Sequence, residues 1–312
     1  MIVIFESILP VFLLIMLGNL LRRTPFVGAE GWLGLERISY WVLYPALLFM
    51  TVLRADFAGL RLDALLVALL VAIGLMAALV LATWPLWKRS GKATRAEFSS
   101  IFQTSLRWNG FIALAVAQKI FPPAGAAVVA LAMAAIIIPL NVMAVAVVSR
   151  FGDREANWAG VARATATNPL ILGVVAALVL RQLPGGLYEP FAGTIDLVAN
   201  AAIGMGLISL GAGLRPADML GLRAALWFPV ALKLAILPVV LCGLAYALGV
   251  RGEELVYLAL CGAVPTAMNG YMLARQLGGD AEFYAAVTTL QTMIAVLTIP
   301  LALALAVQLS SG

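Results

Sequence analysis

The sequence contains no histidine, and charged residues make up only 11% of it. The absence of imidazole excludes Ser-His-Asp and Cys-His catalytic systems, histidine metal sites and a histidine proton switch. There are only two cysteines, Cys242 and Cys261, and both lie in apolar stretches, so neither a disulfide framework nor a cysteine metal site is indicated. No cofactor is expected, and the available chemistry is limited to amides, carboxylates and basic side chains.

What the sequence has in excess is apolar residues. They make up 63% of its 312 residues, against about 45–50% in an ordinary soluble protein. A soluble fold of this length could not cover so much apolar surface, so the chain is expected to be an integral membrane protein surrounded by lipid. The net charge of +5 fits basic cytoplasmic loops, and no nucleic-acid partner is expected.

A membrane-spanning helix needs about 20 mostly apolar residues. The sequence has ten such runs, too long and too uniform for the strands of a barrel, and therefore predicts an all-α membrane protein. The first run is followed, not preceded, by basic residues, so it is kept as a helix and not a signal peptide. The ten predicted spans are residues 3–21, 33–53, 64–87, 98–118, 125–149, 158–181, 190–211, 223–249, 255–276 and 283–309.

The distribution of lysine and arginine predicts the orientation, because cytoplasmic links are enriched in both. One set of alternate links holds twelve basic residues and the other set five. The richer set, which includes Arg89 and Arg154, is therefore assigned to the cytoplasm, and both termini to the outside. A bacterial cytoplasmic membrane is the expected location. The five on the other side are Arg54, Arg61, Lys119, Arg181 and Arg251.

The chain also matches itself at a shift of 159 to 161 residues, in four places that keep their order. This predicts two repeats, residues 1–155 and 156–312. Five spans per repeat is an odd number, so the second repeat must enter the membrane inverted, as in many secondary transporters. The matches are Pro10 and Arg22 with Pro169 and Arg181; Leu53, Arg54 and Asp56 with Leu214, Arg215 and Asp218; residues 109–112 with 269–272; and residues 138–140 with 299–301.

Two of the predicted spans carry an Asn-Gly pair inside an apolar run, at Asn109-Gly110 and at Asn269-Gly270. The second also holds Pro265, which removes a backbone donor and disturbs the preceding turn. Irregular backbone at membrane depth is tolerated where it is buried in protein or lines a wet cavity. The fourth and ninth spans are therefore the expected place of a substrate site.

These residues resemble the auxin efflux carrier family, which includes the plant PIN-formed carriers and bacterial permeases for malonate and malate. The opening Ile8-Leu9-Pro10-Val11-Phe12 is similar to its first helix. The segments 107–111, 265–269, 273–275 and 297–301 are similar to its fourth, ninth and tenth helices. The family usually has a proline shortly after the fourth-helix asparagine, where this chain has Ala113-Leu114-Ala115. Either Gly110 provides the break instead, or this helix is less broken.

The resemblance implies a fold like that of sodium/proton antiporters and bile-acid symporters, in which the broken fourth and ninth helices cross. It implies that spans 1, 2, 6 and 7 form a scaffold, through which the protein is a homodimer. Spans 3–5 and 8–10 would then form a transport unit that moves in an elevator-type alternating-access mechanism.

The candidate substrate-binding residues are Asn109, Asn269, Arg107, Gly110, Pro265 and Thr266. The two amides can bind a substrate while staying neutral, although each could instead satisfy broken-helix backbone. Arg107 lies near the centre of its run, where an arginine is costly unless paired or wet, and its planar fork suits a carboxylate. The alternatives for Arg107 are snorkelling to the membrane surface and an ion pair with Asp196.

Asp196 and Lys233 are the other candidates for charge at depth. Each could carry a coupling proton, or the two could pair, and a structural role is the alternative for both. Gln103, Gln118 and Gln291 could line a cavity or act as polar packing contacts. Asn168, which precedes Pro169, is expected to cap or kink its helix.

The function predicted from these features is secondary transport of a small organic anion, such as a carboxylate. The alternatives are a channel, a receptor that does not transport, and an intramembrane enzyme, although the protease signature Gly-x-Gly-Asp is incomplete at residues 277–280. The nucleotide-binding pattern Gly-x-x-x-x-Gly-Lys is absent, so any active transport must use gradients. No cluster of acidic residues suggests a sodium site, which favours proton coupling or uniport.

Overall fold

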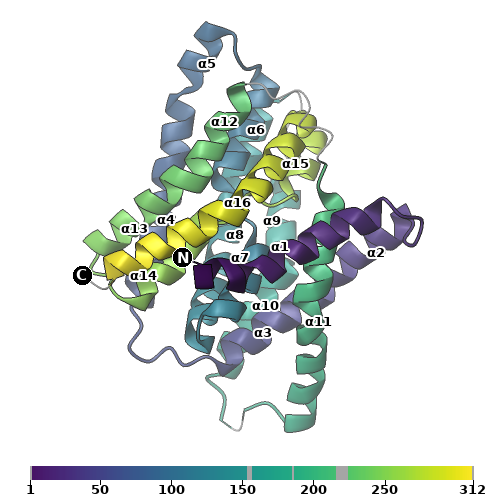
Figure 1. The fold of residues 1–312 in the computed structure, drawn as a ribbon, viewed down its shortest axis with the longest axis vertical. Helices are drawn as coiled ribbons and strands as arrows, with labels where there is room; N and C mark the ends of the chain where they lie inside the picture. The colour runs from purple at the N-terminus through teal and green to yellow at the C-terminus, as the bar shows by residue number, and fades with distance from the viewer. Residues whose placement is uncertain (1, 153–156, 185, 216–223, 311–312) are drawn as a thin grey trace.

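The structure, a computed structural model, describes residues 2–152, 157–184, 186–215 and 224–310. These residues form helices joined by turns and include no β-strand (Figure 1), which confirms the all-α class. The predicted repeat boundary at 155/156 and the basic or acidic residues Arg154, Asp218 and Arg223 lie outside the described residues. The helices are α1 Ile2–Arg22, α2 Ala29–Ile38, the π-helix η1 Ser39–Leu43, α3 Tyr44–Arg54, α4 Leu62–Ala82, α5 Trp84–Ser90, α6 Arg95–Leu106, α7 Gly110–Ile120, α8 Pro123–Phe151, α9 Trp158–Ala166, α10 Pro169–Leu180, α11 Glu189–Gly213, α12 Ala224–Ala231, the π-helix η3 Leu232–Ile236, α13 Leu237–Ala247, α14 Glu253–Ala263, α15 Gly270–Leu277 and α16 Ala281–Ser310.

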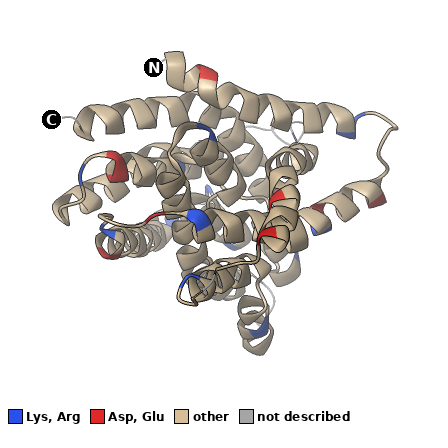
Figure 2. Cartoon of the chain, turned by 90° about the horizontal axis from the view of Figure 1, so that it is seen from below, with Lys and Arg blue, Asp and Glu red and all other residues tan. Residues whose placement is uncertain are grey.

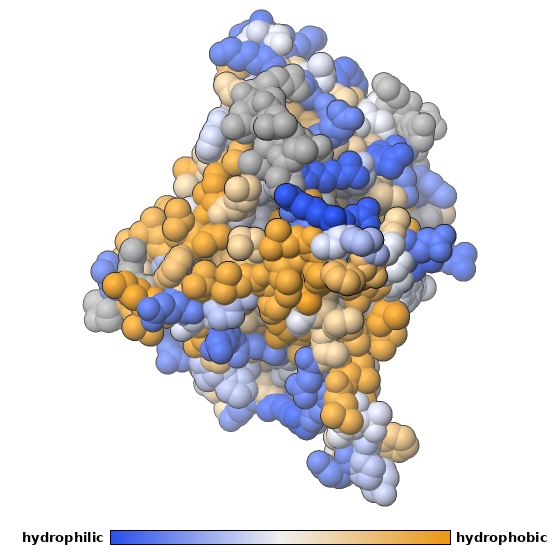
Figure 3. All heavy atoms as spheres, turned by 45° about the vertical axis from the view of Figure 1, so that its right-hand side comes forward, coloured by the Kyte–Doolittle hydropathy of each residue, from blue (hydrophilic) through white to orange (hydrophobic). Residues whose placement is uncertain are grey.

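Among the described residues, six helical segments are long and apolar enough to cross a membrane: residues 2–22, 62–90, 123–151, 189–213, 224–247 and 281–310. The pair α9 and α10, bent by 42° at its break, would make a seventh. An apolar belt crosses the surface between more polar ends (Figure 3), and many charged residues lie at helix ends and in loops (Figure 2). The chain is a multi-pass membrane protein. Within the described residues every predicted run falls on one to three consecutive helical elements, but the count of ten spans stays a prediction.

Some of the helices that pack together are distant in the sequence, and others are close in it. α1 packs against α11, and α3 packs against both α10 and α11. α13 and α16 pack on α14, while α4 packs on α13 and α6 packs on α8. Figure 1 shows α1–α3 and α11 on one side of the molecule and α12–α14 on the other. The N-terminal half of the chain therefore contributes helices to both sides, α1–α3 to one and α4 to the other.

Two short π-helical turns each lead into a proline. η1 precedes Pro45 at the start of α3, and η3 precedes Pro238 at the start of α13. Proline has no backbone N–H to donate and clashes with the preceding turn, and a locally wider helix accommodates it. In η1, Ser39 is buried and Tyr40 is half-buried.

Small residues let α1 and α11 approach closely. A Cβ added at Gly211 would collide with the backbone oxygen of Ile15, and one added at Gly18 would collide with the backbone oxygen of Ile208. Close backbone approach at glycines is a usual way for helices to associate in membranes, where no hydrophobic effect holds them together. The α1–α11 crossing therefore depends on these two glycines.

We expect Gly211→Ala to lower the free energy of unfolding in detergent by about 1–3 kcal/mol, the usual cost of overpacking. The reason is that the obstructing atoms belong to the backbone and cannot rotate away. Gly204→Ala on the same helix is the matched control, because a Cβ there meets nothing within 4 Å. Equal melting temperatures for the two variants would contradict the proposed packing.

Candidate functional site

The fourth predicted span is interrupted at its centre. α6 ends at Leu106 and α7 begins at Gly110, and Arg107 and Asn109 between them have extended backbone conformations. The Asn109 side-chain oxygen accepts hydrogen bonds from the N–H groups of Phe111 and Ile112, both at 3.2 Å. An asparagine is among the best helix N-caps. The break therefore exists without the family's proline, because Asn109 satisfies the start of α7.

The ninth predicted span is interrupted over six residues. α14 ends at Ala263 and α15 begins at Gly270. Val264, which precedes Pro265, is extended, as the residue before a proline tends to be. The backbone N–H of Asn109 donates to the carbonyl oxygen of Pro265 at 2.7 Å, so the two interruptions are in direct contact.

Gln291 of α16 connects the backbone of the second interruption to α12 and to the last turn of α6, just before the first interruption. Its side-chain oxygen accepts from the N–H of Thr266 at 2.9 Å, and its amide nitrogen donates to the carbonyl groups of Thr104 and Pro229, both at 3.0 Å. The side chain is fully buried. Gln291 is therefore a packing contact and does not line the cavity described next.

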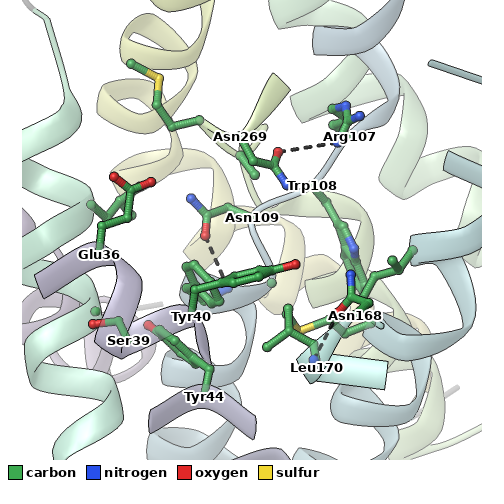
Figure 4. Close-up of a pocket in the computed structure, with 18 of the residues that line it drawn as sticks. Glu36, Ser39, Tyr40, Tyr44, Arg107, Trp108, Asn109, Asn168, Leu170 and Asn269 are labelled. Carbon is green, nitrogen blue, oxygen red and sulfur yellow. Dashed lines mark hydrogen bonds between the residues drawn. The ribbon is translucent and has the colours of Figure 1, made fainter. Parts of the chain in front are cut away.

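A cavity of about 260 Å³ lies where the interruptions meet the second, sixth and seventh predicted spans (Figure 4). Residues 107–109 and 267–269 of the two interruptions line it together with residues of α7 and α8, and residues of α2, η1, α3, α10 and α11 complete the lining. Tyr44 of α3 stacks on Phe111 of α7 with ring centroids 3.7 Å apart. The polar residues that line the cavity include Glu36, Ser39, Tyr40, Tyr44, Arg107, Asn109, Asn141, Asn168, Ser209 and Asn269.

Arg107 is the basic residue among those that line the cavity, and only 7% of it is exposed. Its Nε donates to the Gln103 side chain at 3.2 Å, one terminal nitrogen donates to Asn269 at 3.4 Å and the other donates to Asn141 at 3.1 Å. All three acceptors are neutral amide oxygens, and none of the described carboxylates forms an ion pair with it. Two of its five N–H groups remain for a ligand, and its charge is not compensated.

The two asparagines contribute differently. Asn109 is 1% exposed, and its amide nitrogen has no partner within the described part of the chain. In Figure 4 that nitrogen points towards the space between Glu36 and Asn269. Asn269 is exposed, and its side chain does not cap α15. One amide thus holds the backbone of the break, and the other supports the guanidinium of Arg107.

The structure brings together four of the predicted site residues, Arg107, Asn109, Gly110 and Asn269, on the cavity wall. Pro265 and Thr266 are buried in the second interruption without lining the cavity. The hydroxyl group of Thr266 lies 3.3 Å from that of Tyr284, which also donates to the carbonyl of Ala267 at 2.5 Å. These two predicted residues hold the backbone that presents Asn269.

Asp196 and Lys233 lie elsewhere. Asp196 forms an ion pair with Arg54, so the alternatives in which it pairs with Arg107 or Lys233 are wrong. Lys233 is fully buried in η3 and donates from Nζ to the carbonyl oxygen of Gly262 at 2.9 Å. This contact places its ammonium group at the negative end of the α14 dipole, which stabilises a cation.

The sequence did not assign several cavity residues to the site. Asn168 caps α10, as predicted, by accepting from the N–H of Leu170 at 3.0 Å, but it also lines the cavity. Asn141 is a single amide in the long apolar helix α8, and that isolation was a usable signal. Glu36, Ser39, Tyr40 and Tyr44 carried no pattern that pointed to this cavity.

A cavity with polar side chains in its lining, at the meeting of two interrupted helices inside a bundle of membrane-spanning segments, is typical of transporters. Among the described residues no group of three or more Cys, Asp or Glu side chains is placed to hold a metal ion. The site offers a guanidinium, amides, hydroxyl groups and one carboxylate. Such groups bind and orient a small polar molecule.

Comparison with known proteins agrees with this class. Residues 156–303 match the family model described as membrane transport protein. The chain is also 25% identical over 303 residues to an uncharacterized transporter of Methanothermobacter thermautotrophicus, an alignment that covers 95% of this chain and 96% of that relative. The resemblance to the auxin efflux carrier family inferred from the sequence is confirmed, and the comparisons support a transporter.

Proposed function

We propose that the protein is a secondary transporter that moves a small organic anion, a carboxylate, across the cytoplasmic membrane. The observation that carries the proposal is Arg107. It is a buried guanidinium at the contact between two helix interruptions, and its partners are neutral amides. An arginine at membrane depth is costly, and a carboxylate ligand would compensate its charge with two parallel hydrogen bonds.

The proposed architecture is ten spans in two inverted repeats. The two interruptions support it, because each ends with an asparagine directly before the second half-helix, Asn109 before α7 and Asn269 before α15. They occupy matching positions 160 residues apart in the sequence. Their direct contact through the Pro265 carbonyl fits two helices that cross at their breaks.

We propose that transport uses an elevator-type movement of two bodies. The scaffold comprises α1–α3 and α9–α11, and the transport unit comprises α4–α8 and α12–α16. The packing of α1 and α3 on α11, and of α13 and α16 on α14, supports this division. The cavity has walls from both bodies, so sliding one against the other would carry a ligand held by Arg107. The same proposal includes a homodimer that forms through the scaffold. It also includes transport that is either coupled to protons or uncoupled, as in a uniporter.

A thermal-shift panel on the purified protein tests the proposal. Mono- and dicarboxylates, amino acids and neutral analogues are added with and without sodium. Because a ligand that binds the folded state raises its apparent stability, we expect carboxylates to raise the melting temperature and their amides to have little effect. Sodium should add nothing. A response to the neutral analogues or to sodium, with none to carboxylates, would contradict the assigned substrate class.

The orientation is tested by cysteine labelling on whole cells, in a background without Cys242 and Cys261. We expect Ser90→Cys, in an exposed position beside Arg89, to be protected from an impermeant reagent, because the basic links face the cytoplasm. Gln182→Cys, exposed in a link of the opposite set, should be labelled from outside. The reverse pattern would invert the proposed topology.

A further inference from the structure

The cavity that holds Arg107 also contains one carboxylate. Among the described residues that line it, Glu36 and Arg107 are the two charged ones. They come from different helices, Glu36 from α2 and Arg107 from the end of α6. In Figure 4 they lie on opposite sides of the view, with Asn109 and Asn269 between them. The site therefore has a positive and a negative end.

Neither charge is neutralised within the described part of the protein. The ion pair found there joins Arg54 and Asp196, and Arg107 contacts amide oxygens. No hydrogen bond to the side chain of Glu36 is formed by any described residue. Its neighbour Arg37 is one position along the helix, about 100° around the axis, and does not line the cavity. Glu36 is thus available to a ligand held at its other end by Arg107.

The chemical group at the far end of a ligand held by Arg107 decides whether Glu36 repels or attracts that ligand. A dicarboxylate held by Arg107 would bring its far carboxylate towards Glu36, and like charges at close range are unfavourable. A far ammonium group would instead be attracted, with hydroxyl groups of Ser39 and Tyr40 on the same wall. Selectivity commonly arises from such a repulsive element against the wrong ligand.

We propose that Glu36 is a specificity-determining residue, and that the site prefers short linear carboxylates that carry an ammonium group at the far end. This inference rests on the proposed function, because it assumes that Arg107 binds the carboxylate end. It narrows the substrate class from organic anions in general to ω-amino carboxylates. It also means that a bound ligand contacts both the scaffold and the transport unit.

Three ligands of equal chain length test it by titration calorimetry on the purified full chain: δ-aminovalerate, valerate and glutarate. We expect the wild type to bind δ-aminovalerate most tightly and glutarate least, with steps of about fivefold, the scale of one partly exposed ion pair. Glu36→Gln keeps the shape of the side chain but removes its charge. The affinities for the three ligands should therefore converge, and glutarate should bind more tightly than it does to the wild type. Glu30→Gln is the matched control, since Glu30 lies on α2 outside the cavity lining, and it should keep the wild-type order.

The outcomes separate this inference from the proposed function. If the ligands bind and Arg107→Gln weakens all three, but Glu36→Gln leaves their order unchanged, the inference is overturned and the carboxylate site stands. If none of the three binds, nor the shorter series of γ-aminobutyrate, butyrate and succinate, the inference is overturned, and the thermal-shift panel decides whether the proposed carboxylate site stands. If the affinities for the three ligands converge in Glu36→Gln but keep the wild-type order in Glu30→Gln, the inference is supported.

Discussion

Replacing Arg107 by glutamine is expected to weaken carboxylate binding about 10- to 100-fold, which corresponds to about 1.5–3 kcal/mol for a charged hydrogen bond. The guanidinium is buried and supplies the positive charge among the described cavity residues. Glutamine keeps part of the packing but removes the charge and the bidentate fork. Arg107→Lys should restore only part of the affinity, because an ammonium group cannot form two parallel hydrogen bonds. Titration calorimetry with charged ligands and their neutral amides measures the effect, and the amides should change little.

Arg181→Gln is the control for this prediction. Arg181 donates to the carbonyl oxygens of Val52, Leu53 and Ala55 and lies over the ring of Phe57. Its role is therefore to hold the end of α3, away from the cavity lining. We expect a lower melting temperature with unchanged affinity. If Arg107→Gln gives that same result, Arg107 is a structural residue and the proposed substrate contact is wrong.

The second large effect is expected at Asn109. Asn109→Asp keeps an oxygen that caps α7 but replaces the unpartnered amide nitrogen with a carboxylate oxygen. A negative charge at this place would repel an anion and compete for Arg107, so binding should fall by at least about tenfold, as for other like-charge neighbours. Calorimetry on the folded variant measures the loss. Unchanged affinity in Asn109→Asp would show that this amide does not face the ligand.

Two further variants separate binding from capping. Asn109→Ser retains a good N-cap but lacks the amide donor, so it should weaken binding with little change in melting temperature. Asn269→Ala removes a partner of Arg107 without removing a cap, because its side chain makes no capping bond, and it should also weaken binding. Loss of stability without loss of affinity would mean that both asparagines serve the backbone alone.

The sequence was sufficient to predict the helices and their breaks. Long apolar runs predict helices because only a helix satisfies its backbone within lipid. The Asn-Gly pairs marked both interruptions, and Asn109 caps its second half-helix with its side chain, whereas the side chain of Asn269 makes no capping bond. The chain also shows that proline is dispensable at such a break, because the Asn109 side chain alone satisfies the N–H groups of Phe111 and Ile112.

Contacts between distant helices could not be predicted in the same way. Asp196 was a candidate for charge at depth, with a structural role as the alternative, but its partner, Arg54, lies 142 positions earlier on a different helix. No sequence pattern marked Glu36 as a site residue, because its place in the cavity depends on how α2 packs beside α11. Hydropathy and residue spacing do not predict which distant helices pack together. The position of Glu36 at the negative end of the cavity is therefore known from the structure alone.

Counterflow in proteoliposomes tests the central claim most directly. Vesicles are loaded with the unlabelled carboxylate that gives the largest thermal shift, and uptake of a trace of the labelled compound is followed. We predict a saturable, transient overshoot for the wild type, because alternating access exchanges one bound molecule for another, and no overshoot for Arg107→Gln at the same amount of folded protein. Linear uptake that neither saturates nor overshoots would indicate a channel, and binding without any uptake would indicate a receptor; either result would contradict a transporter that carries its substrate at Arg107.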